Sequence, residues 1–265
     1  HLSLRRQRQM CIRDSGITLT NGTMNVYGGV VTTATITTAA GTKTLTITGG
    51  GIIITGSGTA FNNANPTGFT TGSSAGSISM NNAGAKTFAG GGSVYNMVLD
   101  QGGAGALTIT GANTFNDITN TYKNTGATSI IFPSATTTNV RNFTGGGTVG
   151  KLLTINSSTT GSNATINASA GTPIYGLAYI TMTDIAFTPS PSATSPIYWY
   201  GDTTCTIGAY NQKPQPGVSG ILFLTGATGV AYVITSGTGT WTVPGNWNSS
   251  NNTIHLFGGG GGGGG

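Results

Sequence analysis

The stretch TKTLTIT, residues 42–48, decides the fold class of this chain. Its two large apolar residues, Leu45 and Ile47, alternate with threonines. Successive side chains of a β-strand point to opposite faces, so this period of two turns the apolar residues inward and the hydroxyls outward. Residues 42–48 are therefore predicted to form a half-buried strand.

Short runs of the same kind recur along the chain, separated by Gly, Asn and Ser. They predict further strands at residues 51–55, 93–99, 106–110, 128–132 and 152–156. No window of helical length shows a convincing 3.6-residue period, and strong helix formers are scarce. The fold class is therefore predicted to be all-β.

Internal similarity favours one all-β architecture over another. FAGGGSVYNMVL (residues 88–99) parallels FTGGGTVGKLLT (residues 143–154), and a looser copy opens at residues 49–51. The tripeptide LTI begins at Leu45, Leu107 and Leu153, so the spacing is not constant. An irregular parallel β-solenoid accommodates this variation because insertions fall in its turns, and units of about 20–45 residues would give roughly four to ten windings. A β-sandwich or jelly-roll is the alternative, since it also needs many short strands.

Proline and glycine divide the chain into segments. We expect a solenoid body over residues 16–213, with an exposed loop at TPSPSATSP (residues 188–196), because proline cannot sit inside a sheet ladder. KPQPG (residues 213–217) has the composition of a linker, and we place a boundary there. A small β segment over residues 214–257 and a glycine tail over residues 258–265 follow.

The first residues are expected to be foreign to the natural protein. RRQRQMCIRD (residues 5–14) resembles a one-frame translation of an adaptor used to prepare DNA sequencing libraries. We therefore treat residues 1–15 as an artefact that should not pack against the body. This leader carries four arginines and Asp14, which supply +3 of the formal net charge of +5, and it also holds Cys11.

The remaining composition limits the function classes. Charged residues make up 6% of the chain, against roughly 25% in ordinary globular proteins. The six cations outside the leader are scattered, so the basic patch of a nucleic-acid binder is absent. Cys205 is the only cysteine outside the leader, which excludes an internal disulfide in that part of the chain. The most apolar stretch, residues 221–235, is interrupted by TGATG, so a membrane span is not expected.

Two parts of the chain resemble a known class of proteins. GTWTVPGNWNSSNNTIHLFGGGG (residues 239–261) is similar to the lead-in of glycine-rich domains in bacteriophage tail fibres and other virion proteins. Residues 90–119 and 152–171 resemble Thr/Gly/Asn-rich repeats of phage-derived and bacterial-surface sequences. The resemblance implies an extracellular or virion-surface structural role, often as a homotrimer, with no cofactor. The glycine tract ends after eight residues at Gly265, which we interpret as truncation.

Candidate site residues are few, and no catalytic, cofactor-binding or metal-binding set is predicted. Asp184 and Asp202 form the only nearby carboxylate pair, and we interpret both as turn residues rather than glycosidase acids. Tyr198, Trp199 and Tyr200 are the best candidates for glycan contact, because aromatic faces stack on sugars; strand packing is the alternative.

The other aromatic and polar residues receive structural interpretations. Trp241 and Trp247 are interpreted as packing anchors, and His255 has no second histidine outside the leader with which to form a metal site. Rows of Asn and Thr could form hydrogen-bonded ladders along stacked strands.

These features predict a non-catalytic structural fragment of a phage tail fibre, or of a similar virion appendage, that attaches to a host-surface glycan or receptor. The alternatives are a bacterial surface adhesin resembling an autotransporter passenger and, third, a glycan-degrading enzyme. Polysaccharide lyases with solenoid folds combine several acidic calcium ligands with a basic residue, and four scattered aspartates fall short of that set.

Overall fold

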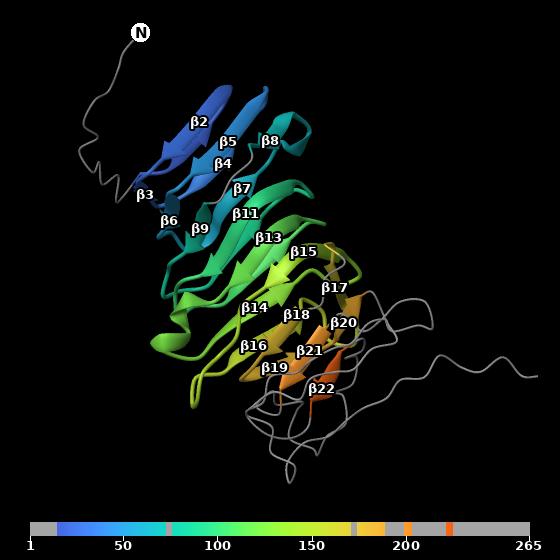
Figure 1. Cartoon of the computed structure of the whole chain (residues 1–265). Helices are drawn as coiled ribbons and strands as arrows, with labels where there is room; N and C mark the ends of the chain where they lie inside the picture. Colours follow the sequence, from blue (N-terminus) through green and yellow to red (C-terminus); the bar gives the residue numbers. More distant parts are fainter. Residues whose placement is uncertain (1–14, 73–75, 171–173, 189–198, 203–220, 225–265) are drawn as a thin grey trace, which may run out of the picture.

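The chain folds into an elongated stack of parallel β-strands that wind around one long core, and no α-helix occurs in the described part (Figure 1). The computed structural model describes residues 15–72, 76–170, 174–188, 199–202 and 221–224. The predicted glycine tail and linker, together with Cys205, Trp241, Trp247 and His255, lie outside these residues.

Four parallel sheets make up the stack. The first long sheet contains, in spatial order, β1 (Ile17–Leu19), β4 (Ile36–Thr38), β7 (Gly58–Asn63), β10 (Lys86–Ala89), β12 (Leu107–Thr110), β14 (Thr128–Phe132), β16 (Leu153–Ser157) and β19 (Ile180–Thr183). The second long sheet contains β3 (Val30–Thr33), β6 (Gly51–Ile54), β9 (Ser77–Met80), β11 (Val94–Gln101), β13 (Thr114–Thr119), β15 (Thr137–Phe143), β17 (Ala164–Ala168) and β20 (Ile185–Thr188). An N-terminal short sheet contains β2 (Gly22–Tyr27), β5 (Lys43–Thr48) and β8 (Phe69–Thr71), and a C-terminal one contains β18 (Ile174–Leu177), β21 (Trp199–Asp202) and β22 (Leu222–Leu224).

This topology is a parallel β-solenoid, as predicted, and it excludes the jelly-roll, whose strands pair antiparallel. Each winding, called a coil below, places one strand in the first long sheet, and coils are numbered from the N-terminus. The sequence step between paired residues varies from 19, between Ile17 and Ile36, to 28, between Gly58 and Lys86. Short strands stay in register while the connections between them absorb the difference.

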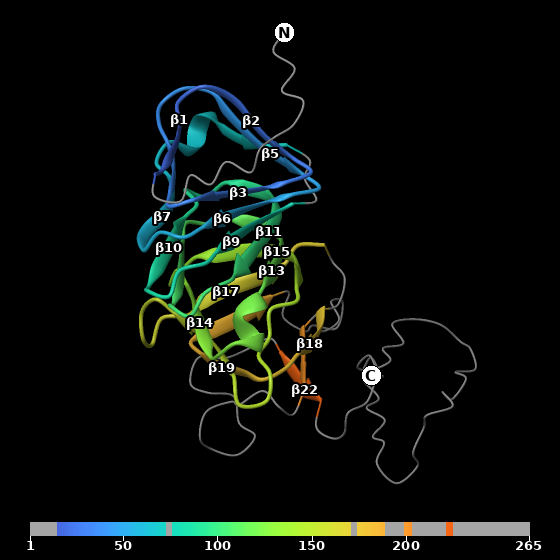
Figure 2. The same ribbon diagram turned by 90° about the vertical axis from the view of Figure 1, so that its left-hand side faces the viewer.

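The cross-section changes along the stack, as Figures 1 and 2 show. The first three coils have three sides, because each contributes a strand to the N-terminal short sheet. In the fourth coil the chain passes from β10 to β11 through four residues, and the eight-residue strand β11 contacts both β8 and β9. The short sheet therefore ends at β8, which leaves an edge strand on the side of the molecule.

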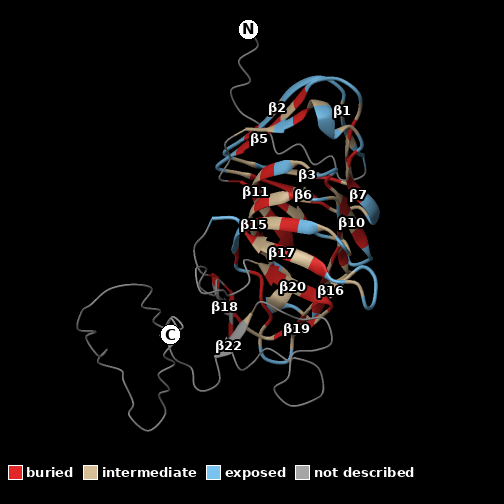
Figure 3. Cartoon of the chain, turned by 90° about the vertical axis from the view of Figure 1, so that its right-hand side faces the viewer, coloured by how far each residue is buried: buried red, intermediate tan, exposed pale blue. Residues whose placement is uncertain are grey.

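Buried residues, coloured red in Figure 3, recur along the whole stack, and paired strands place their side chains in columns from coil to coil. On the second long sheet, one fully buried column runs through Ile52, Ile78, Leu99, Ile118 and Phe143. Burying a large apolar side chain contributes about 1.5–3 kcal/mol, so these columns dominate the stability of the stack. The predicted alternation in residues 42–48 is confirmed, because Leu45 and Ile47 are fully buried and the threonines face outward.

Aromatic rings fill the core where the three-sided part meets the two-sided part. Phe61 and Phe88 stack with their centroids 4.2 Å apart and an interplanar angle of 7°. Tyr95 meets both rings edge-on, at 5.7 and 5.0 Å, and stacks with Phe115 at 5.5 Å. This aromatic cluster joins the third, fourth and fifth coils.

Glycines form the tight corners between strands. Gly49 adopts a φ of +64°, a conformation that glycine reaches without the cost that other residues meet, and thereby ends β5. A Cβ on the following residue, Gly50, would collide with the backbone oxygen of Gly29 in the coil before it. The high glycine content therefore reflects close approach between stacked corners as well as tight turns.

The six predicted strands are all present. The repeated sequence motifs, however, do not lie at equivalent positions of successive coils. Gly90–Gly92 connect the first long sheet to the second, but Gly145–Gly147 lie on the return from the second to the first. Leu45 belongs to the N-terminal short sheet, while Leu107 and Leu153 belong to the first long sheet. Each coil requires side chains that fit those of its neighbours. It does not require the same sequence motif at the same corner.

Two described features lie near the predicted segment boundaries. Ser15 lies within the described residues, and its carbonyl accepts hydrogen bonds from the Thr33 hydroxyl and the Ala34 N–H. Its backbone is therefore part of the first coil, one residue before the predicted start at residue 16. In the predicted C-terminal segment, β22 pairs in parallel with β21 and so extends a sheet of the solenoid.

Candidate functional site: a notch beside strand β8

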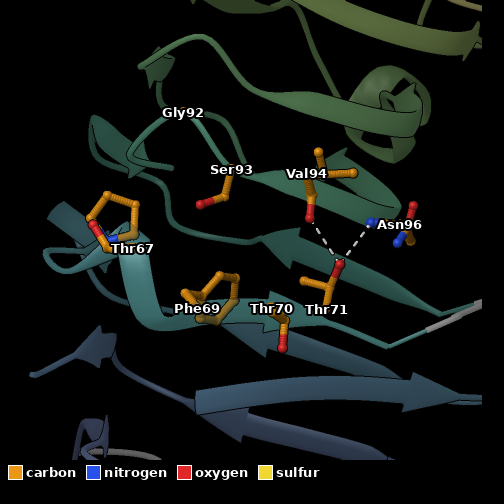
Figure 4. A pocket seen from close by; sticks show the side chains of 9 residues that line it. Thr67, Phe69, Thr70, Thr71, Gly92, Ser93, Val94 and Asn96 are labelled. Carbon is orange, nitrogen blue, oxygen red and sulfur yellow. Dashed lines mark hydrogen bonds between the residues drawn. The ribbon is translucent and has the colours of Figure 1, made fainter. Parts of the chain in front are cut away.

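The end of the N-terminal short sheet leaves a notch in the side of the solenoid (Figure 4). Its volume is about 500 Å³, and it opens to solvent. One wall comes from the third coil, with the 3-10 turn η1 (Pro66–Gly68) and β8, and the other comes from the start of β11 in the fourth coil. The lining residues are Pro66, Thr67, Phe69, Thr70, Thr71, Gly92, Ser93, Val94 and Asn96.

The notch exists because the two walls touch at one end only. The Thr71 hydroxyl donates a 2.9 Å hydrogen bond to the Val94 carbonyl and accepts a 3.2 Å bond from the Asn96 N–H, as Figure 4 shows. A side chain thus joins β8 to β11 in place of a backbone ladder. Toward Phe69 and Gly92 no such link is present among the described bonds, and the walls separate.

A buried polar network fixes the wall that carries Ser93. The Asn63 amide nitrogen donates to the Ser93 hydroxyl at 3.0 Å, to the Gly90 carbonyl at 3.2 Å and to the Tyr95 hydroxyl at 3.1 Å. Tyr95 in turn donates to the Gly90 carbonyl at 2.7 Å, and burial raises the pKa of its phenol. Because the network lies in the core, its hydrogen bonds hold the Ser93 side chain in a fixed position.

The lining of the notch is neutral and of mixed polarity. The hydroxyls of Thr67 and Ser93 and the amide of Asn96 are neutral donors and acceptors, and the exposed Val94 side chain supplies apolar surface. The Thr70 hydroxyl is bonded to Thr44 and to the Lys43 carbonyl, and Phe69 is buried in the core. None of the lining residues is titratable. The lining therefore holds no group that could serve as a general acid, a general base or a charged electrostatic stabiliser.

Two of the described aspartates are buried and accept structural hydrogen bonds. Asp100 is 5% exposed and accepts from the hydroxyls of Ser79, Thr119 and Thr121 and from the Thr121 N–H. Asp184 adopts a φ of +55° in the corner between β19 and β20, and its carboxylate accepts from the Gly161 N–H at 2.8 Å. Its placement at a corner agrees with the interpretation of Asp184 as a turn residue.

Asp117 lies on the outer face, half-buried. Its carboxylate accepts hydrogen bonds from the Thr144 N–H at 2.9 Å and the Thr144 hydroxyl at 2.7 Å. Burial raises the pKa of this group, and the two bonds from Thr144 act in the opposite direction. Asp117 thus connects the fifth coil to the end of β15.

Two lysines lie in the interior. Each belongs to an Ala-Gly-x-Lys-Thr sequence and is the first residue of a strand. The Lys43 ammonium donates to the Ala39 and Gly41 carbonyls at 2.5 and 2.7 Å. The Lys86 ammonium donates to the Gly105, Asn82 and Gly103 carbonyls at 2.5, 3.2 and 3.4 Å. Burial lowers the pKa of Lys86 to about 8, against the opposing attraction of Asp100.

The predicted aromatic group is only partly described. Trp199 is fully buried, packs against Phe187 and Phe143 with centroids 4.7 and 6.3 Å away, and donates through its indole N–H to the Thr188 carbonyl at 2.8 Å. The indole ring of Trp199 is therefore part of the core in this structure. Tyr198 and the side chains of Tyr200 and Asp202 lie outside the described residues.

The second long sheet carries a polar ladder on its outer face. Thr188 donates to Asn167 at 2.9 Å, Asn167 donates to Asn139 at 2.9 Å, and Asn139 donates to Thr114 at 3.4 Å. The four residues belong to successive strands in direct register. The predicted Asn/Thr ladder is therefore present and links the coils on the outside.

Sequence reasoning missed the notch. Its two walls lie more than twenty positions apart, and they meet only because the fourth coil lacks a strand in the short sheet. The available signal was the short connection GGGS between β10 and β11, compared with the long connection from β7 to β8 and β9.

Comparisons with family models, with curated proteins and with solved structures found no match to this chain. Within the described ranges, no cluster of three or more His, Cys, Asp or Glu residues could hold a metal ion. No helix in that part of the chain has the length and apolar character needed to cross a bilayer.

Proposed function

We propose that this protein is a non-catalytic structural part of a phage tail fibre, or of a similar virion appendage, and serves in attachment to a host surface. The observation that carries the proposal is the continuous stack of parallel coils, which is buried inside and held by hydrogen-bonded ladders outside. A stack of this kind is an extended, stiff element that can hold a binding surface away from a particle.

The distribution of charge supports a structural role. Lys86, Asp100 and Asp184 are buried and hydrogen-bonded to neighbouring coils, and Lys43 is buried and bonded to carbonyls of its own coil. The first three side chains thus serve cohesion between coils. The outer faces present mainly threonine, serine and asparagine, which suit reversible contact with hydroxyl-rich surfaces.

The resemblance of residues 239–261 to the lead-in of virion glycine-rich domains favours the virion over other extracellular settings. The same resemblance class contains many homotrimers, and we include trimer assembly in the proposal. A bacterial surface adhesin is the second candidate, because the Thr/Gly/Asn-rich body resembles such sequences equally well.

Localisation separates the two candidates. Antibodies against the solenoid body, applied to virus particles and to bacterial envelopes purified from the same source, should label an appendage of the particle by immunogold electron microscopy. Label confined to the bacterial envelope would support the adhesin. Label on neither structure would contradict both candidates.

Attachment itself can be measured with the purified protein. Fluorescently labelled protein should bind intact cells of a susceptible strain and should compete with the phage for adsorption. Absence of binding to every strain that adsorbs the phage would overturn the attachment role, even if the protein were found on the particle.

A further inference from the structure

We propose that the notch beside β8 is a binding subsite for one or two units of a neutral saccharide. This inference rests on the proposed attachment function and assigns it to particular residues. It differs from the sequence prediction, which placed glycan contact at Tyr198, Trp199 and Tyr200.

The dimensions of the notch fit a small ligand. Its volume of about 500 Å³ lies within the range of about 300–1,000 Å³ that is typical of small-molecule sites. The Thr71 bridge closes the notch at one end, where the Thr71 hydroxyl joins β8 to β11. A site closed at that end favours a short unit over a polymer strand that would run through it.

The lining has the mixed character that a sugar requires. A pyranose ring presents apolar C–H faces and a rim of hydroxyls. In the notch, Val94 is 53% exposed and offers apolar contact, whereas the Phe69 ring is 6% exposed and packs against Tyr95. Thr67, Ser93 and Asn96 add hydrogen-bonding groups, while the Thr70 hydroxyl is bonded to Thr44 at 2.9 Å.

The backbone edge of β8 adds further polar groups. The Gly72 N–H donates to the Leu45 carbonyl of β5, so by the alternation of a parallel strand the Thr71 peptide groups face the opposite side. That side is the notch, since β8 is the edge strand of its sheet. Fixed backbone donors and acceptors commonly orient ligands in such pockets.

The absence of charge in the lining selects the class of sugar. Acidic saccharides are usually held by arginine or lysine, whose charge-assisted hydrogen bonds are about twice as strong as neutral ones. None of the nine lining residues is charged. We therefore assign the notch to neutral hexoses or N-acetylhexosamines, and not to uronic or sialic acids.

Binding can be tested by saturation-transfer NMR and calorimetry on the full chain. The probes are glucose, galactose, mannose and N-acetylglucosamine, with glucuronic acid and N-acetylneuraminic acid as acidic counterparts. At least one neutral probe should bind. Val94→Lys, which extends a charged chain into the notch, should weaken that binding by at least about tenfold, which corresponds to 1.4 kcal/mol. Asn96→Ala should weaken it severalfold.

Val30→Lys is the matched control, because Val30 is also 53% exposed and lies in β3, away from the notch. It should bind the same probe within about twofold of the unaltered protein. Melting curves of all three variants should stay close to that of the unaltered protein, since the substituted side chains lie at the surface.

The outcomes separate this inference from the proposed function. Binding of acidic probes alone, or neutral binding that is unchanged in both Val94→Lys and Asn96→Ala, would overturn the notch assignment. Attachment to cells with no binding of any neutral probe would also overturn it, while the attachment function would stand. Loss of cell attachment in Val94→Lys, with Val30→Lys unaffected, would support both.

Discussion

Lys86 is a buried charge whose lowered pKa contributes to the pH dependence of stability. Its ammonium is enclosed by three backbone carbonyls, and burial lowers its pKa to about 8 from the ordinary 10.5. Between these two values the unfolded chain binds more protons than the folded one, so stability must rise with pH across that window. The rise is expected to be at most on the order of 3 kcal/mol.

The prediction for Lys86 is an increase in the free energy of unfolding between pH 8 and pH 10 that disappears in Lys86→Met. Tyr95 limits the window from above, because its raised pKa makes stability fall once the unfolded chain loses its tyrosine protons near pH 10. Urea unfolding at pH 7.5, 8.5 and 9.5 measures the slope. Lys123→Met, at a half-exposed position, serves as the control. An equal slope in Lys86→Met would show that another group is responsible.

At the scale of the strand, sequence reasoning succeeded where side-chain alternation carries the information. Residues 128–132 form a strand with the predicted bounds, and Leu45 and Ile47 point inward as the period of two requires. Alternation reports only which face is buried. It does not report which strands are neighbours, so the repeated Gly-Gly-Gly text was matched across corners that lie on different sides of the coil.

The notch was beyond sequence reasoning for the same reason. It depends on the length of the fourth coil relative to the third, and coil lengths in this chain have no fixed period. The position of Thr71 beside Val94 follows only once the registers of β8, β9 and β11 are known. In contrast, the existence of an Asn/Thr ladder could be predicted from the sequence, because stacked parallel strands bring outward-facing side chains of neighbouring coils together.

Asn167 is the central member of that ladder and tests its contribution. It donates to Asn139 and accepts from Thr188, so Asn167→Ala removes two hydrogen bonds between three strands. The net contribution of one hydrogen bond to stability is about 0.5–1.5 kcal/mol. Because these side chains are partly exposed, we expect Asn167→Ala to lower the free energy of unfolding by about 1–2 kcal/mol. Denaturant unfolding measures it.

A double-mutant cycle identifies the origin of the effect. Asn139→Ala and Asn167→Ala together should cost less than the sum of the single changes, because both remove the same bond. Strict additivity would mean that the two amides act through their own strands and that the ladder adds nothing between coils.

For the whole molecule, stacking implies that stability is divided among interfaces between neighbouring coils. In solenoids each unit contacts only its neighbours, so a weakened interface can separate the parts on either side of it. The aromatic cluster forms the interface at which the three-sided coils join the two-sided ones. Phe88 is its central member, because its ring contacts Phe61, Tyr95 and Phe115.

Phe88→Ala should therefore uncouple the first three coils from the rest. Removing a fully buried phenylalanine costs about 3–5 kcal/mol. Hydrogen exchange should then accelerate by about a hundredfold or more in β1 to β7, since 1.4 kcal/mol corresponds to tenfold, and should change little in β14 to β19. Met182→Ala, at a fully buried position in β19, should produce the opposite pattern, with faster exchange confined to the C-terminal coils. Equal acceleration along the whole stack in either variant would show that the solenoid unfolds as one cooperative unit. In that case, a change of stability at the notch would affect every coil of the stack.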